Sequence, residues 1–119
     1  MNSERFYKRG DVLLIDFEPV CGSEQGKIRP AVVIQNDVAN KYSPVIIVSA
    51  ITSSPRSPHP TDIEVFAPIG GLSKDSKILL NQIRTVDKIR VIQRLGHLPN
   101  EIMSKVDEAI KISLGLIPI

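Results

Sequence analysis

Short apolar runs separated by polar turn segments fill most of the chain, and this pattern predicts a mainly β protein. The predicted strands cover Val12–Phe17, Pro30–Gln35, Val45–Ile51, Thr61–Phe66, Ile78–Val86 and Arg90–Leu95. Between them, Asn36 to Tyr42 is polar and turn-like, and Gly70-Gly71 marks a turn. The proline-rich segment Ser53–Pro60 can be neither a helix nor a central strand.

The last part of the chain changes to a helical period. Apolar residues at spacings of three and four there predict one face of an amphipathic helix, formed by Ile102, Val106, Ala109, Ile110 and Leu114. We expect Asn100, or the residue before Pro99, to cap the start of this helix and Gly115 to end it. The whole pattern favours a small, strongly bent antiparallel sheet or an SH3-like β-barrel packed on a helix.

Composition narrows the class of protein. A chain of 119 residues fits a single domain covering residues 1–119. With three Phe, two Tyr and no Trp, the core should be aliphatic, and reading bases mainly with aromatic platforms is not expected. The net charge of +2 permits a nucleic-acid partner without arguing for one.

Cysteine and hydropathy indicate the compartment. The single Cys21 allows no intrachain disulfide, which fits a reducing cytoplasm. No apolar run approaches the ~20 residues of a membrane span. Cys21 and the two His are too scattered for a zinc motif, so we expect no metal site.

The stretch Gly22–Asp37 offers the first candidate chemistry, because a polar loop there runs into an apolar strand. Pro30 fixes its own backbone and biases Arg29 towards an extended conformation. A cation at this point can be aimed by the strand while it faces a cleft. On pattern alone, Arg29 is more often a solvated surface charge and Thr52 more often a turn residue.

Five short motifs in a fixed order carry a family resemblance. They are Arg9-Gly10-Asp11-Val12, Gly22-Ser23-Glu24-Gln25 with Arg29-Pro30, Ile51-Thr52-Ser53, the run from Leu79 to Asp87, and Val106-Asp107-Glu108-Ala109 with Ile112-Ser113-Leu114. With these motifs, the chain resembles the MazF/PemK family of toxin endoribonucleases over nearly its whole length. The resemblance implies an SH3-like barrel, a homodimer and cleavage of single-stranded RNA without metal or other cofactor. It also implies neutralisation by a small MazE-like antitoxin.

The resemblance assigns roles to individual residues. Arg29 matches the family's catalytic Arg, Thr52 its catalytic Thr, and Glu24 an acidic loop residue linked to activity in part of the family. The RNA-binding candidates are Phe17, Ser23, Gln25, Gln82 and Arg84. Some relatives carry His where this chain has Ser23 or Ile28, and roles of those His do not carry over.

These residues suit RNA cleavage by the RNA's own 2′-hydroxyl. Such a reaction needs a proton acceptor, a proton donor and stabilisation of growing negative charge. The guanidinium of Arg29 can grip two phosphate oxygens, stabilise that charge and donate a proton to the leaving oxygen. Thr52 can hold the phosphate in line. The base stays open among Glu24, a backbone carbonyl and water.

Other functions for the chain, and other roles for some of these residues, stay open. A CcdB-like gyrase inhibitor shares the barrel but relies on a Trp-Gly-Ile ending, whereas this chain has no Trp and ends in Pro118-Ile119. A non-catalytic RNA- or peptide-binding barrel would not need both Arg29 and Thr52. Glu24 could simply pair with Lys27 at the surface. His59 receives little weight as a catalyst, and His97 is expected to be structural.

Overall fold

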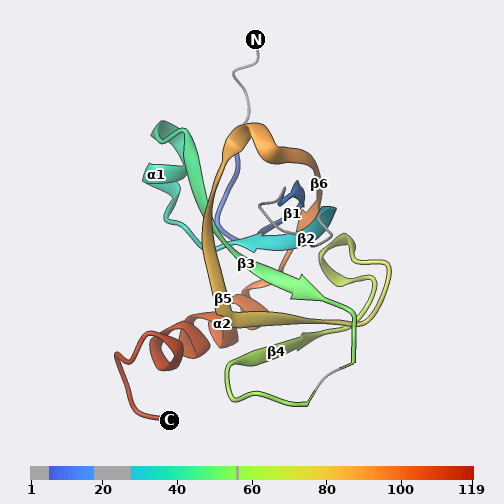
Figure 1. The fold of residues 1–119 in the computed structure, drawn as a ribbon, viewed down its shortest axis with the longest axis vertical. Coiled ribbons are helices and arrows are strands. Elements are labelled where there is room, and N and C mark those ends of the chain that lie inside the picture. The colour runs from blue at the N-terminus through green and yellow to red at the C-terminus, as the bar shows by residue number, and fades with distance from the viewer. Residues whose placement is uncertain (1–5, 18–27, 56) are drawn as a thin grey trace.

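The computed structural model describes residues 6–17, 28–55 and 57–119. Their elements are β1 (Asp11–Asp16), β2 (Ile28–Val33), α1 (Asp37–Tyr42), β3 (Val45–Thr52), β4 (Asp62–Val65), η1 (Ile69–Gly71), β5 (Ser76–Asp87), η2 (Lys88–Arg90), β6 (Val91–His97) and α2 (Asn100–Ser113) (Figure 1). Every predicted strand and the C-terminal helix are present, and no strand end is shifted by more than two residues. Within the described ranges, no helix combines the length and the apolar composition needed to cross a membrane.

All six strands belong to one antiparallel sheet. Their order is β4-β5-β3-β2-β1-β6, and each neighbouring pair is antiparallel. The predicted class, mainly β with a C-terminal helix, is therefore confirmed. The sheet is open rather than a closed barrel, because β4 and β6 are its two edges and pair with β5 and β1 respectively.

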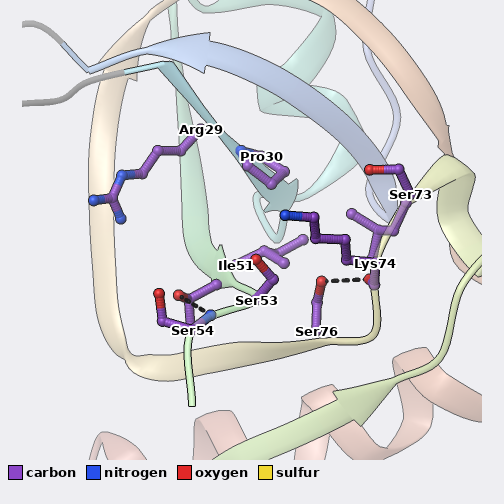
Figure 2. Close-up of a pocket in the computed structure, with 10 residues that line it drawn as sticks. Arg29, Pro30, Ile51, Ser53, Ser54, Ser73, Lys74 and Ser76 are labelled. Atoms are coloured by element: carbon purple, nitrogen blue, oxygen red, sulfur yellow. Dashed lines mark hydrogen bonds between the residues drawn. The ribbon is translucent and has the colours of Figure 1, made fainter. Parts of the chain in front are cut away.

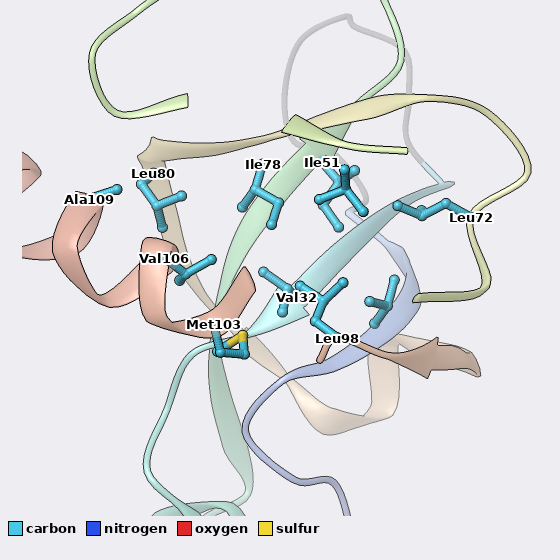
Figure 3. Packing of buried hydrophobic residues seen from close by; sticks show 11 residues of the cluster. Val32, Ile51, Leu72, Ile78, Leu80, Leu98, Met103, Val106 and Ala109 are labelled. Atoms are coloured by element: carbon cyan, nitrogen blue, oxygen red, sulfur yellow. The ribbon is translucent and has the colours of Figure 1, made fainter. Parts of the chain in front are cut away.

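Apolar side chains are buried on both faces of this bent sheet. Within β1, Val12 belongs to a cluster covered by α2, whereas Leu13 belongs to a second cluster, as the alternation of a strand requires. Figure 3 shows Met103 and Val106 of α2 pointing towards the strands of the first cluster. The second cluster contains Tyr7, Leu13, Ile15, Ala31, Val33, Ile46, Val48, Val86 and Val91. Both clusters are chiefly aliphatic, as predicted.

The segment after β2 departs from the prediction. Residues 37–42, predicted as part of a turn, form helix α1. The side chain of Asn36 caps this helix by accepting a hydrogen bond from the Ala39 N–H at 2.8 Å. Asn40 is fully buried and exchanges hydrogen bonds with the side chain and backbone of Gln35. Polar side chains therefore stabilise a short helix that has no apolar period.

The start of α2 also differs from the prediction. Pro99 occupies the N-cap position without a side-chain cap, and Asn100 is the first helical residue, so the predicted cap is wrong. The other end agrees, because Gly115 follows the helix with a φ of 77°. Leu114, predicted on the buried face, is exposed, and Met103 is a further buried residue of the helix.

A buried aspartate joins the N-terminal segment to β6. Asp11 accepts hydrogen bonds from the Lys8 N–H at 2.9 Å and from Arg94 Nε at 3.1 Å. Its second carboxylate oxygen lies 2.9 Å from His97 Nδ1. This contact supports the structural role predicted for His97.

Candidate active site

A pocket of about 330 Å³ opens where the start of β2, the end of β3 and the segment before β5 meet (Figure 2). It is lined by Arg29, Pro30, Ile51, Thr52, Ser53, Ser54, Leu72, Ser73, Lys74 and Ser76. Ile51 and Leu72 belong to the apolar cluster beneath α2, so this side of the lining is anchored in the core. Apart from Pro30, the remaining lining residues carry hydroxyl groups or positive charges, and such a lining suits a polar, anionic ligand.

The neighbouring strands β2 and β3 bring Arg29 and Thr52, two of the three predicted catalytic residues, to the same pocket. β2 and β3 pair with Ala31 opposite Ala50. The paired residues end there, and Arg29 and Thr52 lie two residues further along, on the sides of their strands that carry Ala31 and Ala50. A cation and a hydroxyl from neighbouring strands therefore line the same pocket at this end of the sheet.

Arg29 is exposed at the rim of the pocket. Figure 2 shows its side chain extending to one side, with the guanidinium group away from Lys74. Because Arg29 is the second residue of β2, its backbone is held while its side chain reaches into solvent. A guanidinium so placed offers its donors to an incoming phosphate.

Thr52 is partly buried at the last position of β3. Its Oγ1 accepts a hydrogen bond from the Ser54 N–H at 3.1 Å. The hydroxyl hydrogen is then available to donate to a phosphate oxygen. The contact also orients the hydroxyl before any substrate arrives.

Lys74 adds a second cation that the sequence analysis missed. It lies between η1 and β5, where Ser76 Oγ donates a hydrogen bond to its backbone oxygen at 2.8 Å. Figure 2 shows the Lys74 ammonium group inside the pocket, between Pro30 and Ser53. A lone lysine in a polar turn carries no functional signal in a sequence, and only the fold places it beside β2 and β3.

Three predicted RNA-binding residues lie outside the pocket lining. Arg84 is opposite Val48 in the β3–β5 pair, and its guanidinium carbon is 4.8 Å from the centre of the Phe17 ring, a cation–π distance. Val48 and Thr52 are four residues apart on β3 and therefore share a face. Gln82 is exposed two residues before Arg84. Gln82 and Arg84 thus add exposed polar side chains on β5, outside the pocket lining.

Three other predicted site residues, Ser23, Glu24 and Gln25, lie outside the described residues, and their roles stay predictions. His59 lies in the loop after β3, with its Nδ1 3.0 Å from Thr61 Oγ1, and it is not among the residues that line the pocket. In the described part of the chain, no three His, Cys, Asp or Glu side chains are grouped to hold a metal ion.

Known proteins share both the sequence and the fold. Residues 8–114 match the family described as the PemK-like, MazF-like toxin of type II toxin–antitoxin systems. Endoribonuclease EndoA of Bacillus subtilis (strain 168) is 53% identical over 111 residues, which cover 92% of this chain and 96% of that protein. None of these matches supports the gyrase-inhibitor alternative.

Solved structures show the same fold at lower identity. MazF from Deinococcus radiodurans has a TM-score of 0.77 at 23% identity, covering 92% of this chain and 97% of that chain. An endoribonuclease from mycobacterial species has a TM-score of 0.76 at 20% identity, covering 92% of each chain. Because residues 8–114 match its family model and the Bacillus relative is 53% identical, the chain is a member of the PemK-like, MazF-like family of toxins from type II toxin–antitoxin systems.

Proposed function

We propose that this toxin is an endoribonuclease that cuts single-stranded messenger RNA at short sequence motifs without a metal ion. The 53% identical Bacillus relative is named an endoribonuclease, which supports this reaction class. The observation that supports the assignment is that Arg29 and Thr52 both line one polar pocket. The toxin would act in the cytoplasm, where its substrate is found.

The reaction starts from the 2′-hydroxyl of the RNA. A base takes its proton, the 2′-oxygen bonds to the adjacent phosphorus, and the bond from phosphorus to the 5′-oxygen breaks. The 5′-oxygen takes up a proton, so the products carry a 2′,3′-cyclic phosphate and a 5′-hydroxyl. Arg29 grips two phosphate oxygens and stabilises the growing charge, while Thr52 holds the phosphate in line. The base is Glu24, a backbone carbonyl or water.

Lys74 contributes attraction rather than orientation. Its ammonium is a compact charge on a flexible stem and lacks the planar, two-pronged geometry of a guanidinium. It lines the pocket from the segment before β5, whereas Arg29 lines it from β2. A phosphate bound between these segments would therefore be attracted by both cations, with Arg29 as the group that responds to the transition state.

Cleavage of a long RNA by the purified chain in excess chelator tests the proposed function. Wild type should give discrete fragments with 5′-hydroxyl ends. Arg29→Ala should lose about 100-fold or more in rate, as for removal of a main charge stabiliser, while remaining folded because Arg29 is exposed. Arg90→Ala removes an exposed arginine on η2, outside the pocket, and should cut normally.

Three results would contradict this assignment. Intact RNA with wild type would indicate a non-catalytic RNA-binding protein, provided that RNA still binds. Cleavage that stops when chelator is added would contradict the metal-free reaction. Normal cutting by Arg29→Ala would show that Arg29 is not the charge-stabilising residue.

The toxin should form a homodimer. Several large apolar side chains are exposed on the isolated chain, among them Ile28 on β2, Ile89 on η2 and Ile92 on β6. The side chain of Ile89 is 82% exposed. Covering such a surface with a second copy would bury apolar area that a small chain leaves in water. Light scattering at micromolar concentration should give twice the monomer mass, and a monomer would refute this proposal.

An acidic, partly disordered antitoxin segment should compete with RNA for the face that carries Arg29, Gln82 and Arg84. A complex named MazE–MazF from Deinococcus radiodurans has a TM-score of 0.77 at 24% identity, which supports the existence of such a partner. Both ligands are anionic, so Arg84→Glu should weaken both, whereas Lys105→Glu on α2 should weaken neither. Simultaneous binding of antitoxin and uncleavable RNA, with unchanged affinities, would refute competition.

A further inference from the structure

A second hollow of about 140 Å³ adjoins the catalytic pocket. The two share Thr52, Ser53, Ser54 and Ser76. The rest of the second lining consists of Pro55, Glu64, Phe66, Asp75 and Lys77. A chain-like ligand whose phosphate lies at Thr52 can therefore continue directly into the second hollow.

Phe66 brings an aromatic ring to this second hollow. β4 ends at Val65, whose side chain is buried in the core, and strand alternation turns the next side chain outward. Phe66 is consequently 57% exposed. A ring left in water beside polar groups is the kind of surface on which bases of single-stranded RNA stack.

Two carboxylates distinguish the second hollow from the cationic pocket. Glu64 and Asp75 line it, and Asp75 Oδ1 accepts a hydrogen bond from the Ala67 N–H at 2.9 Å, which fixes that carboxylate beside the end of β4. Carboxylates repel a phosphate but accept hydrogen bonds from the amino groups of bases. The second hollow therefore suits a base, whereas the pocket of Arg29 suits the phosphate.

We propose that the second hollow is a base-binding subsite, in which a base adjoining the scissile phosphate stacks on Phe66. The proposal rests on the proposed endoribonuclease function and adds a residue that selects the RNA sequence. Glu64 and Asp75 favour a base with an amino group, namely adenine, cytosine or guanine, over uracil. One ring serves one base, so the low aromatic content of the chain does not conflict with this subsite.

Cleavage of a randomised RNA pool tests the subsite. Wild type should prefer an amino-bearing base at one position beside the cut. Phe66→Ala should lose that preference and cut the preferred site about tenfold more slowly, whereas Phe66→Tyr keeps a ring and should retain both properties. Tyr42→Ala, which removes a 74% exposed ring from α1, should change neither.

Fluorescence supplies a readout that does not depend on cleavage. The chain has no Trp, so Phe66→Trp and Tyr42→Trp each introduce a single reporter. RNA carrying 2′-O-methyl groups lacks the nucleophile and stays intact. Its binding should quench Phe66→Trp but not Tyr42→Trp, because the eight residues of β3, at about 3.3 Å each, separate α1 from the hollow.

The outcomes separate the subsite from the reaction. If wild type cuts RNA while Phe66→Ala keeps the same rate and base preference, the subsite is overturned and the proposed function stands. An unquenched Phe66→Trp variant that binds the methylated RNA overturns the subsite as well. If wild type does not cut RNA, the proposed function is wrong and the subsite is rejected with it.

Discussion

Replacing Gly71 with alanine should destabilise the chain much more than the same replacement at Gly115. The two glycines have nearly identical φ angles of 76° and 77°. An L-residue at such an angle costs about 1–2 kcal/mol at either position. Nothing lies within 4 Å of a Cβ added at Gly115, so the conformational cost should be the whole effect there.

At Gly71 a steric cost adds to the conformational one. The new Cβ would lie 1.9 Å from the backbone oxygen of Leu95, and no side-chain rotation can relieve that contact. Either η1 or β6 must move, and overpacking of this kind costs about 1–3 kcal/mol. The total for Gly71→Ala is therefore about 2–5 kcal/mol, against about 1–2 kcal/mol for Gly115→Ala.

Urea unfolding of both variants measures this difference through the transition midpoints at an unchanged m-value. The chain continues from Gly71 to Leu72, Ser73 and Lys74, which line the pocket, so Gly71→Ala should also slow RNA cleavage under conditions where it remains folded. Gly115→Ala should cut RNA normally. Equal unfolding free energies for the two variants would refute the close packing of η1 on β6.

Other substitutions test the site, the electrostatics and the core. Thr52→Ala should slow cleavage with little loss of RNA affinity, and Thr52→Ser should recover part of the rate; a Ser variant as inactive as Ala would refute the role of the hydroxyl. A hydrogen bond from the Arg9 N–H lowers the pKa of the Asp37 carboxyl from its ordinary value of 3.8. The ionised carboxylate therefore stabilises the folded chain above about pH 3.8, and this stabilisation is lost as pH falls through the lowered pKa. In urea unfolding between pH 5 and pH 3, Asp37→Asn should not show this pH-dependent fall in the free energy of unfolding, whereas wild type should. Leu98→Ala should cost about 2–5 kcal/mol because Leu98 is fully buried, whereas Leu116→Ala, at an exposed position, should cost less than about 0.5 kcal/mol in the same assay.

The strands could be predicted because each is a short apolar run bounded by proline, glycine or polar turn residues. Helix α1 could not be predicted this way, because its stability comes from a cap and a buried amide rather than from an apolar face. Asparagine is typical of turns, and the sequence alone does not show the hydrogen-bond partners that Asn36 and Asn40 have in the folded chain. The sheet would close into a barrel only if β4 paired with β6. These strands are far apart in the sequence, so no local pattern predicts whether they pair.

The two parts of the candidate site depend on different long-range contacts. Arg29 and Thr52 were predicted through the family resemblance, and both line the pocket because β2 and β3 are neighbouring strands. Lys74, in contrast, reaches the pocket because η1 packs closely against the backbone of β6, as the contact between Gly71 and Leu95 shows. Phe66, at the end of β4, carries no signal in the sequence beyond strand alternation. A change that loosens η1 should therefore affect phosphate attraction and base selection before it disturbs the Arg29–Thr52 pair.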